Sequence, residues 1–272
     1  MQVYRGMDIG TAKPSASTRE EIPHHMVDVA DPIDDFDVAT FQRMARSVVD
    51  TASTDGVRLV IVGGSGLHFR SLVDPYSFSP TDLSIRERLE ETPADELAER
   101  LVAIDSDAPT AIDLSNPRRV VRALETWELT GVKPSDRAAS AEYQMIKNYV
   151  PLIPHVSIGF DAGDRAHAMA NRRFDAMMDR GLLDEVRLLS PGLGRVAGQA
   201  VGYKELAPVV RDGAELTSAV ENAKRATRGL IKRQRTFFRR DPRIQWMPWQ
   251  DDSTQRAAAV TEMLERTTGW TS

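Results

Sequence analysis

An apolar run in the first quarter of the chain constrains the fold more than any other feature. It spans residues 57–62, and Arg58 is its single polar member. A strand with one solvent face alternates apolar and polar residues, so this run predicts a strand buried on both faces, as in a parallel sheet. GGSG follows at residues 63–66, and a helical pattern begins there. This order predicts an α/β fold, and the turn is either an anion site or a plain tight turn.

Strand and helix patterns alternate in most of the remaining chain. Short strands are predicted at residues 26–29, 155–160 and 244–247. Asp37 is expected to cap a helix that continues to residue 52, and Asp164 is expected to open one long helix that reaches residue 189. A last amphipathic helix is predicted over residues 252–267. This alternation is typical of α/β proteins.

Strand signals are absent from residues 81–149, where only helical patterns recur. We therefore expect an all-helical insertion at 81–149 between two parts of an α/β core, residues 1–80 and residues 150–272. One helix of the insertion begins at Pro117 and ends before Gly131. Its first turns are rich in Arg, which is unfavourable for the helix dipole. The cluster indicates an anionic partner, and a solvated helix end is an equally good interpretation.

The most basic stretch of the chain lies at residues 222–243. Lys and Arg greatly outnumber its acids there, whereas the whole chain carries a formal net charge of -5. On a helix, one narrow stripe would consist of Arg228, Lys232, Arg235 and Arg239. A neighbouring apolar face, expected to pack on the core, would consist of Leu230, Ile231, Phe237 and Phe238. Such concentrated charge matches a nucleic-acid phosphate backbone, and a solvated basic face is the alternative.

The composition excludes several classes of site. The chain has no Cys, which excludes disulfides, thiolate zinc sites and a Cys nucleophile. No apolar run approaches the ~20 residues that span a bilayer. We expect a cytoplasmic monomer that has no membrane partner and holds no metal through its own side chains.

Several segments together resemble one known family. In chain order they are MQVYRGMDIGTAKP, PHHMVD, VGGSGL, NPRRVVRALE, RRFDAMMDRGLLDEV, AVGYKE and KRQRTFFR. These segments are similar to those of bacterial tRNA dimethylallyltransferases (tRNA isopentenyltransferases), over essentially the whole chain. VGGSGL alone would be a weak signal, whereas MDIGTAKP, GYKE and the basic helix are specific in combination.

The resemblance implies a reaction and its partners. The dimethylallyl group of dimethylallyl diphosphate would move to the N6 amine of the adenosine just 3′ of the anticodon, in tRNAs that read codons starting with U, and diphosphate would leave. It also implies a P-loop NTPase-like core, Mg²⁺ as cofactor, and binding of the tRNA anticodon stem-loop. In this family the P-loop holds the prenyl diphosphate, so an ATPase or kinase fits worst. An adenylate isopentenyltransferase and a catalytically dead RNA-binding fragment remain alternatives.

The motifs assign roles to individual residues. Ser65 matches a position near the adenosine and Arg173 matches an Arg that clamps the diphosphate, so both are expected to be catalytic. The residues expected to contact tRNA are Met1, Gln2, Ser65, Arg86, Arg118, Arg119, Val120, Val121, Arg122, Gln199, Ala200, Val201, Gly202, Tyr203, Lys204, Lys232, Arg233, Gln234, Arg235, Thr236, Phe237, Phe238 and Arg239. Thr11 and Lys13 lie in the signature loop without an assigned role.

The sequence departs from the family pattern at its start. The family opens with a P-loop, a helix and a strand that ends in Asp-Ser, and these elements are not in the sequence. We therefore expect the general-base Asp to lie upstream of Met1, which would be an internal Met chosen as the start by a misplaced gene call. On this hypothesis the first strands of the core are missing, and residues 1–272 by themselves are expected to be poorly soluble and inactive.

Overall fold

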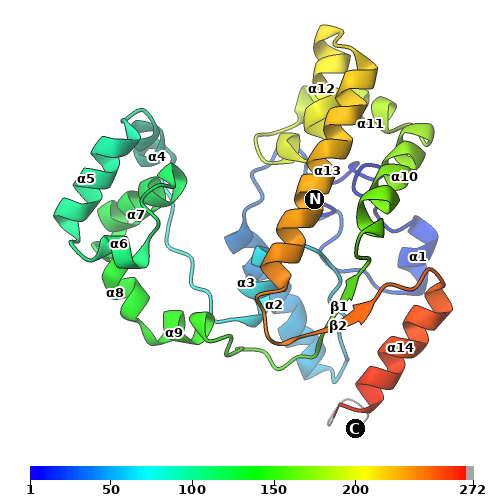
Figure 1. Cartoon of the computed structure of the whole chain (residues 1–272), viewed down its shortest axis with the longest axis horizontal. Coiled ribbons are helices and arrows are strands. Elements are labelled where there is room, and N and C mark those ends of the chain that lie inside the picture. Colours follow the sequence, from blue (N-terminus) through cyan, green and yellow to red (C-terminus); the bar gives the residue numbers. More distant parts are fainter. Residues whose placement is uncertain (268–272) are drawn as a thin grey trace. The chain divides into compact units, whose positions relative to one another are not determined.

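A computed structural model describes residues 1–267 of the chain. The chain forms two compact units (Figure 1). Unit 1 comprises residues 1–69 and 155–272, and unit 2 comprises residues 70–154. The described part is mostly helical and contains one small parallel sheet. The prediction of an α/β fold with parallel strands is therefore confirmed.

The sheet lies in unit 1 and pairs two strands that are far apart in the sequence. β1 (Ser157–Asp161) and β2 (Ile244–Pro248) run parallel, with Gly159 opposite Trp246. A Cβ at Gly159 would lie 2.8 Å from the Trp246 ring, so glycine allows the two strands to approach here. The strands predicted at residues 155–160 and 244–247 are confirmed.

Two other predicted strands are wrong. Residues 57–62 are neither strand nor buried: Val60 is 79% exposed and Val62 is 90% exposed. An apolar run becomes a strand only when neighbouring backbones take its hydrogen bonds, and residues 59–62 have no backbone hydrogen bond within the described chain. Residues 26–29 form turns, and the pairing next to them is a single bridge between Tyr4 and Ala30.

Two helices of unit 1, α2 (Val38–Thr54) and α3 (Gly66–Val73), begin where the sequence indicates. α2 starts at Asp37, whose carboxylate accepts the Thr40 N–H at 2.7 Å. α3 leaves the GGSG turn and enters unit 2. The other helices of this unit are α1 (Ala16–Glu21), α12 (Tyr203–Asp212), α13 (Leu216–Phe238) and α14 (Ser253–Glu265), with 3₁₀ turns at Ser190–Gly192 and Ala197–Gln199.

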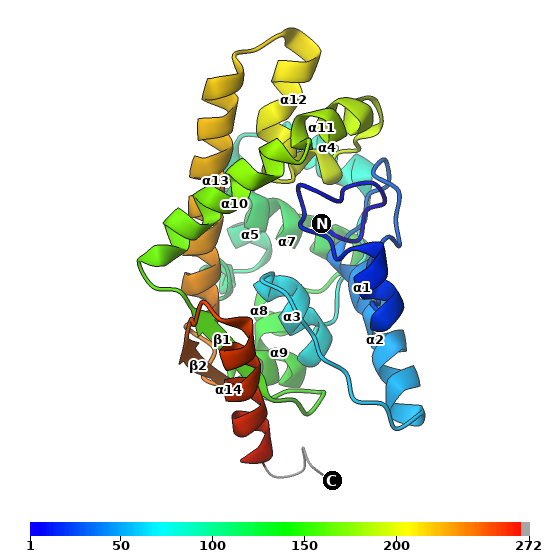
Figure 2. The same ribbon diagram turned by 90° about the vertical axis from the view of Figure 1, so that its right-hand side faces the viewer.

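The long helix predicted between residues 164 and 189 is two helices. α10 (Arg165–Asp179) ends before Gly181, which has a φ of +95°, and α11 (Leu182–Leu189) follows. That backbone conformation costs glycine little and other residues more, so Gly181 allows the chain to change direction. The apolar periodicity continues across the break, which is why the pattern alone predicted one helix. α10 also packs against α13 (Figure 1, Figure 2).

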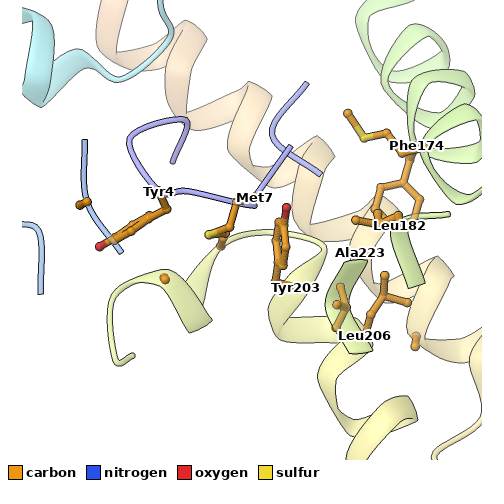
Figure 3. Close-up of a cluster of buried hydrophobic side chains, with 13 residues drawn as sticks. Tyr4, Met7, Phe174, Leu182, Tyr203, Leu206 and Ala223 are labelled. Atoms are coloured by element: carbon orange, nitrogen blue, oxygen red, sulfur yellow. The ribbon is translucent and has the colours of Figure 1, made fainter. Parts of the chain in front are cut away.

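The core of unit 1 joins the N-terminal loop to the C-terminal helices. Tyr4 and Met7 are buried with Phe174 and Tyr203 (Figure 3). α13 contributes its N-terminal half: the residues that it buries are Ala219, Ala223 and Thr227. The apolar face predicted further along α13 is not core, because Leu230 and Phe237 are 36% and 38% exposed.

Unit 2 consists of helices. They are α4 (Leu83–Glu90), α5 (Ala94–Ile104), α6 (Ala108–Ala111), α7 (Pro117–Thr130), α8 (Pro134–Ala139) and α9 (Ala141–Lys147). α5 and α7 pack together over a core that includes Leu97, Leu101, Val120 and Leu124. Gly131 ends α7 with a φ of +71°, as predicted. None of the helices in residues 1–267 is long and apolar enough to cross a membrane.

Candidate functional site

The GGSG turn packs tightly against the basic helix α13. A Cβ at Gly66 would lie 2.1 Å from the Phe237 ring, and a Cβ at Gly64 would lie 2.5 Å from Gln234 Nε2. Glycine is therefore required at residue 66, where an aromatic ring occupies the space. This packing brings Ser65 next to α13, so two of the predicted tRNA-contacting segments meet in the structure.

Ser65 itself is exposed and hydrogen bonded to a histidine. Its hydroxyl lies 2.7 Å from His68 Nδ1, one turn further along α3. The His68 ring packs edge-on against Phe41 of α2, with ring centroids 4.7 Å apart. Burial, together with the positive charge of the Met1 α-amino group, lowers the pKa of His68. His68 is therefore neutral at neutral pH, and the motifs did not single it out.

The C-terminal half of α13 is the predicted basic surface. A groove of about 340 Å³ is lined by Lys232, Arg235, Arg239, Ile231, Thr236 and, from α10, His167. Asp161, at the end of β1, accepts hydrogen bonds from Arg235 at 3.1 Å and from Arg239 at 2.7 Å. The Gly163 N–H and these guanidinium groups hold the pKa of Asp161 below its usual value.

The predicted basic stripe contains cations that have a side-chain partner and a cation, Lys232, that has none within residues 1–267. The Arg228 guanidinium donates to Asn171 at 3.0 Å, and Asp161 balances part of the charge of Arg235 and Arg239. The Lys232 ammonium group is exposed and has no side-chain partner among residues 1–267. Arg233 is exposed in the same way. The net charge of this surface is positive, as a polyanion requires.

Glu185 organises the N-terminal signature loop, and no sequence signal identified it. Its carboxylate accepts the backbone N–H groups of residues 8–10, at 3.0, 2.7 and 3.0 Å in order. The same carboxylate accepts the Tyr203 hydroxyl at 2.5 Å. Tyr203 is fully buried against Gly10, where a Cβ would lie 2.5 Å from the ring. The signature loop, α11 and α12 are therefore joined through the Glu185 carboxylate.

The two loop residues without an assigned role are both structural in this fold. The Lys13 side chain is 1% exposed, and its ammonium group contacts Asp8 and Asp28 at 2.5 Å and the Tyr4 carbonyl at 2.8 Å. The Thr11 hydroxyl donates to the Met7 carbonyl at 2.6 Å. A buried, fully paired ammonium is not available to a ligand.

The other predicted contacts in unit 1 differ in exposure. Gln2 donates to the carbonyls of residues 11 and 12 at 3.1 Å, and Met1 is 50% exposed. In the segment of residues 199–204, Ala200 and Tyr203 are buried, so their side chains belong to the core. Lys204 is exposed and bonds Gln199 at 2.9 Å. Gly202 is buried as well, and the remaining positions are half-buried or exposed: Val201, Gln234, Thr236, Phe237 and Phe238.

Arg173 lies on α10, one residue before buried Phe174. It is exposed and forms no hydrogen bond or ion pair within the described chain. Its guanidinium group is thus available to an anion, and Arg172 beside it is equally available. The structure does not bring Arg173 into contact with Ser65.

In unit 2, the predicted arginines fall into two classes. The buried Glu125 carboxylate binds Arg86 at 2.9 Å and Arg122 at 2.7 Å. Burial alone would raise the pKa of Glu125, but these hydrogen bonds hold it below the usual value. Arg118 and Arg119 are exposed and have no side-chain partner in residues 1–267. The side chains of Val120 and Val121 are buried in the core of the unit.

The chain is similar to known proteins in sequence and in structure. Residues 2–241 match the family described as IPP transferase. A tRNA dimethylallyltransferase of Pseudarthrobacter chlorophenolicus is 41% identical over 273 residues, which covers 96% of this chain and 87% of the relative. One from Bifidobacterium longum is 39% identical over 252 residues, covering 90% and 74%.

A solved structure has the same fold. The full-length tRNA isopentenylpyrophosphate transferase of Bacillus halodurans superposes with a TM-score of 0.68 at 32% identity, covering 97% of this chain and 84% of that one. The family match spans both units and includes the GGSG turn, Glu185 and the whole of the basic helix α13. This chain therefore belongs to the IPP transferase family.

Proposed function

We propose that the protein transfers a dimethylallyl group from dimethylallyl diphosphate to the N6 amine of an adenosine in tRNA, just 3′ of the anticodon in tRNAs that read codons starting with U. Diphosphate is the second product. One observation supports the proposal beyond family membership: the packing of Gly66 on Phe237 holds the exposed Ser65 against α13, the helix that also forms the basic groove. A polar side chain for the base and cations for the backbone thus lie on neighbouring elements.

The proposed RNA surface has two parts, each in its own unit. In unit 1 it consists of Lys232, Arg233 and Arg239, whose charges suit the phosphates of a stem-loop. In unit 2 it consists of Arg118 and Arg119, which are exposed and form no side-chain hydrogen bond or ion pair within residues 1–267, although Arg119 interacts electrostatically with Asp113. Arg86 and Arg122 support this surface through Glu125, which fixes the start of α4 against α7.

We propose that Arg173 binds the diphosphate, since its exposed guanidinium can form two parallel hydrogen bonds to phosphate oxygens. The described residues contain no group of three or more His, Asp or Glu side chains that could hold a metal ion. They do not fit a protein-ligated Mg²⁺ site, so no step is assigned to that ion.

A second proposal concerns the fold around the exposed apolar run at residues 57–62. We infer that residues 57–62 form an inner strand of a P-loop-type parallel sheet when a segment preceding Met1 pairs with them. The support is physical: four apolar side chains of this run are at least 50% exposed, and its backbone is unpaired over residues 59–62. Such a segment would also carry the P-loop and the general-base Asp.

A transfer assay tests the proposal. Residues 1–272, and the same chain extended by its upstream codons, are incubated with labelled dimethylallyl diphosphate and an unmodified anticodon stem-loop. We expect the extended form to label the RNA, and a stem-loop with purine in place of the target adenosine to stay unlabelled. Labelling of free adenylate instead would indicate a nucleotide substrate, and no labelling by either form would refute prenyl transfer.

We also propose that the protein is a monomer, and gel filtration tests this.

A further inference from the structure

The Ser65 hydroxyl has an unusual partner for a residue at a helix start. A Ser before the first turn usually accepts an N–H of that turn and so caps the helix. Among the described residues, no N–H of α3 donates to the Ser65 hydroxyl, which instead lies 2.7 Å from His68 Nδ1. The side chain is therefore committed to the imidazole ring and not to the helix.

The His68 ring is itself held in place. The Phe41 ring meets it edge-on, with an interplanar angle of 75° and a centroid distance of 4.7 Å. Burial lowers the pKa of His68, which keeps the ring neutral. A neutral imidazole has one nitrogen that accepts a hydrogen bond and one that donates. With Nδ1 as the acceptor, the Ser65 hydroxyl is the donor.

The tautomer in which Nδ1 is the acceptor is the one on which the inference is built, and it determines what Ser65 can offer a ligand. A hydroxyl has one hydrogen and two lone pairs, so a hydroxyl that donates to Nδ1 presents only lone pairs to solvent. The exocyclic amine of adenine presents N–H groups, which suit those lone pairs. A carbonyl oxygen at the same place, as in hypoxanthine, would face the Ser65 oxygen without a hydrogen between them.

We propose that His68 is a positioning residue that orients the Ser65 hydroxyl as the hydrogen-bond acceptor for the exocyclic amine of the target adenosine, and so selects adenine over bases without that amine. The inference rests on the proposed function, because it takes the acceptor base to be adenine and Ser65 to be the residue beside its amine. Phe41 supports His68 by limiting the rotation of its ring.

The test measures RNA binding, so it does not depend on transfer. Anticodon stem-loops carrying adenosine, purine or inosine at the target position are titrated against the wild-type chain and four variants. His68→Phe keeps a ring against Phe41 but removes the acceptor nitrogen, and His68→Asn restores an acceptor oxygen near the position of Nδ1. Ser65→Ala and the double variant S65A/H68F complete a cycle that isolates the coupling between the two residues.

Wild type is expected to bind the adenosine stem-loop about fivefold more tightly than the purine stem-loop, as one net hydrogen bond would give. Ser65→Ala should abolish this preference, and the double variant should behave in the same way. In His68→Phe the Ser65 hydrogen is free to face the base and to be donated to the inosine carbonyl, so this variant should instead lose the wild-type preference for adenosine over inosine, and His68→Asn should retain most of it. A preference for adenosine over inosine that survives in His68→Phe, or no preference for adenosine over purine in wild type, would overturn the inference. Adenine selectivity without any labelling in the transfer assay would refute the proposed function alone.

Discussion

The Tyr203 hydroxyl donates to the Glu185 carboxylate at 2.5 Å, and this bond joins α12 to α11. The carboxylate also holds the three N–H groups of residues 8–10, so the signature loop depends on a residue of α11. Burial and the bond to Glu185 raise the pKa of Tyr203 above its ordinary range, which keeps the phenol protonated as the donor.

Tyr203→Phe removes that donor and leaves the ring in place. The carboxylate then loses one charge-assisted hydrogen bond in a buried site, so we expect a loss of about 1.5–3 kcal/mol in the free energy of unfolding. Urea unfolding measures it. Tyr143→Phe is the control, because Tyr143 is 36% exposed and its hydroxyl has no partner within residues 1–267. Equal losses in both variants would contradict the role of the Glu185 bond.

The three glycines of the GGSG turn should tolerate alanine very differently. At Gly66 the new methyl group meets the Phe237 ring at 2.1 Å, so we expect overpacking to cost about 1–3 kcal/mol and to weaken RNA binding. At Gly64 the obstacle is the end of the flexible Gln234 side chain, and a smaller effect is expected. Gly63, with nothing within 4 Å, is the control. Thermal unfolding and stem-loop titration of the three variants should rank them in this order.

Arg173→Ala should impair transfer without lowering stability. The side chain is exposed and unpaired in the described chain, so its loss leaves no buried group without a partner. If it binds the diphosphate, kcat/KM should fall by about 10²–10³-fold in whichever form of the chain transfers the label. Arg172→Ala removes the same charge one residue away and should change the rate much less. Similar rates for the two variants would remove Arg173 from the site.

The arginines at the start of α7 should separate RNA binding from stability. Arg118→Ala and Arg119→Ala are expected to weaken stem-loop binding and to reduce the slope of log K against log salt by about one unit per phosphate contact. Arg122→Ala should instead lower the free energy of unfolding, because the buried Glu125 carboxylate then loses one of its two arginine partners. Titrations at several salt concentrations, combined with unfolding curves, test this division. An unchanged salt slope in both exposed-arginine variants would show that they do not contact phosphate.

Unit 2 should lose stability in acid through Glu125. The folded state holds the pKa of Glu125 below its ordinary value of 4.5, so the contribution is present above that pH and is lost as the pH falls below it. Glu125→Gln should cost about 3–5 kcal/mol at neutral pH and should flatten the acid dependence. Hydrogen exchange of the backbone N–H groups of α7, followed from pH 7 to well below pH 4.5, measures both effects locally. The same acid slope in wild type and variant would assign it to other carboxylates, such as Asp105.

The local signals of the sequence proved reliable where hydrogen bonds are local. Asp37 caps α2 with its own side chain, and Gly131 ends α7 in a left-handed conformation. Both depend on residues within one turn, so the pattern contains the whole interaction. The basic stripe of α13 was found in the same way, because helical geometry alone places Lys232 and Arg235 on one side. Family membership likewise followed from contiguous motifs.

Signals that depend on a distant partner were less reliable. The apolar run at residues 57–62 predicted a buried strand, but burial needs neighbouring strands, which the run itself does not contain. The break at Gly181 was hidden because apolar spacing continues through a left-handed residue. The apolar face of α13 was assigned to the core, yet Phe237 packs on the GGSG turn and stays partly exposed.

The sequence by itself determined the family, the ends of several helices such as α2 and α7, and the position of the basic surface, because these depend on residue order and short-range geometry. Tertiary structure alone decided which charged residues are available. It pairs Arg86 and Arg122 with Glu125 and buries Lys13 among carboxylates, while it leaves Arg118 and Arg173 unpaired within the described chain. Partners such as Glu185 and residues 8–10 are separated by most of the chain, and only the packed core brings them within hydrogen-bond distance.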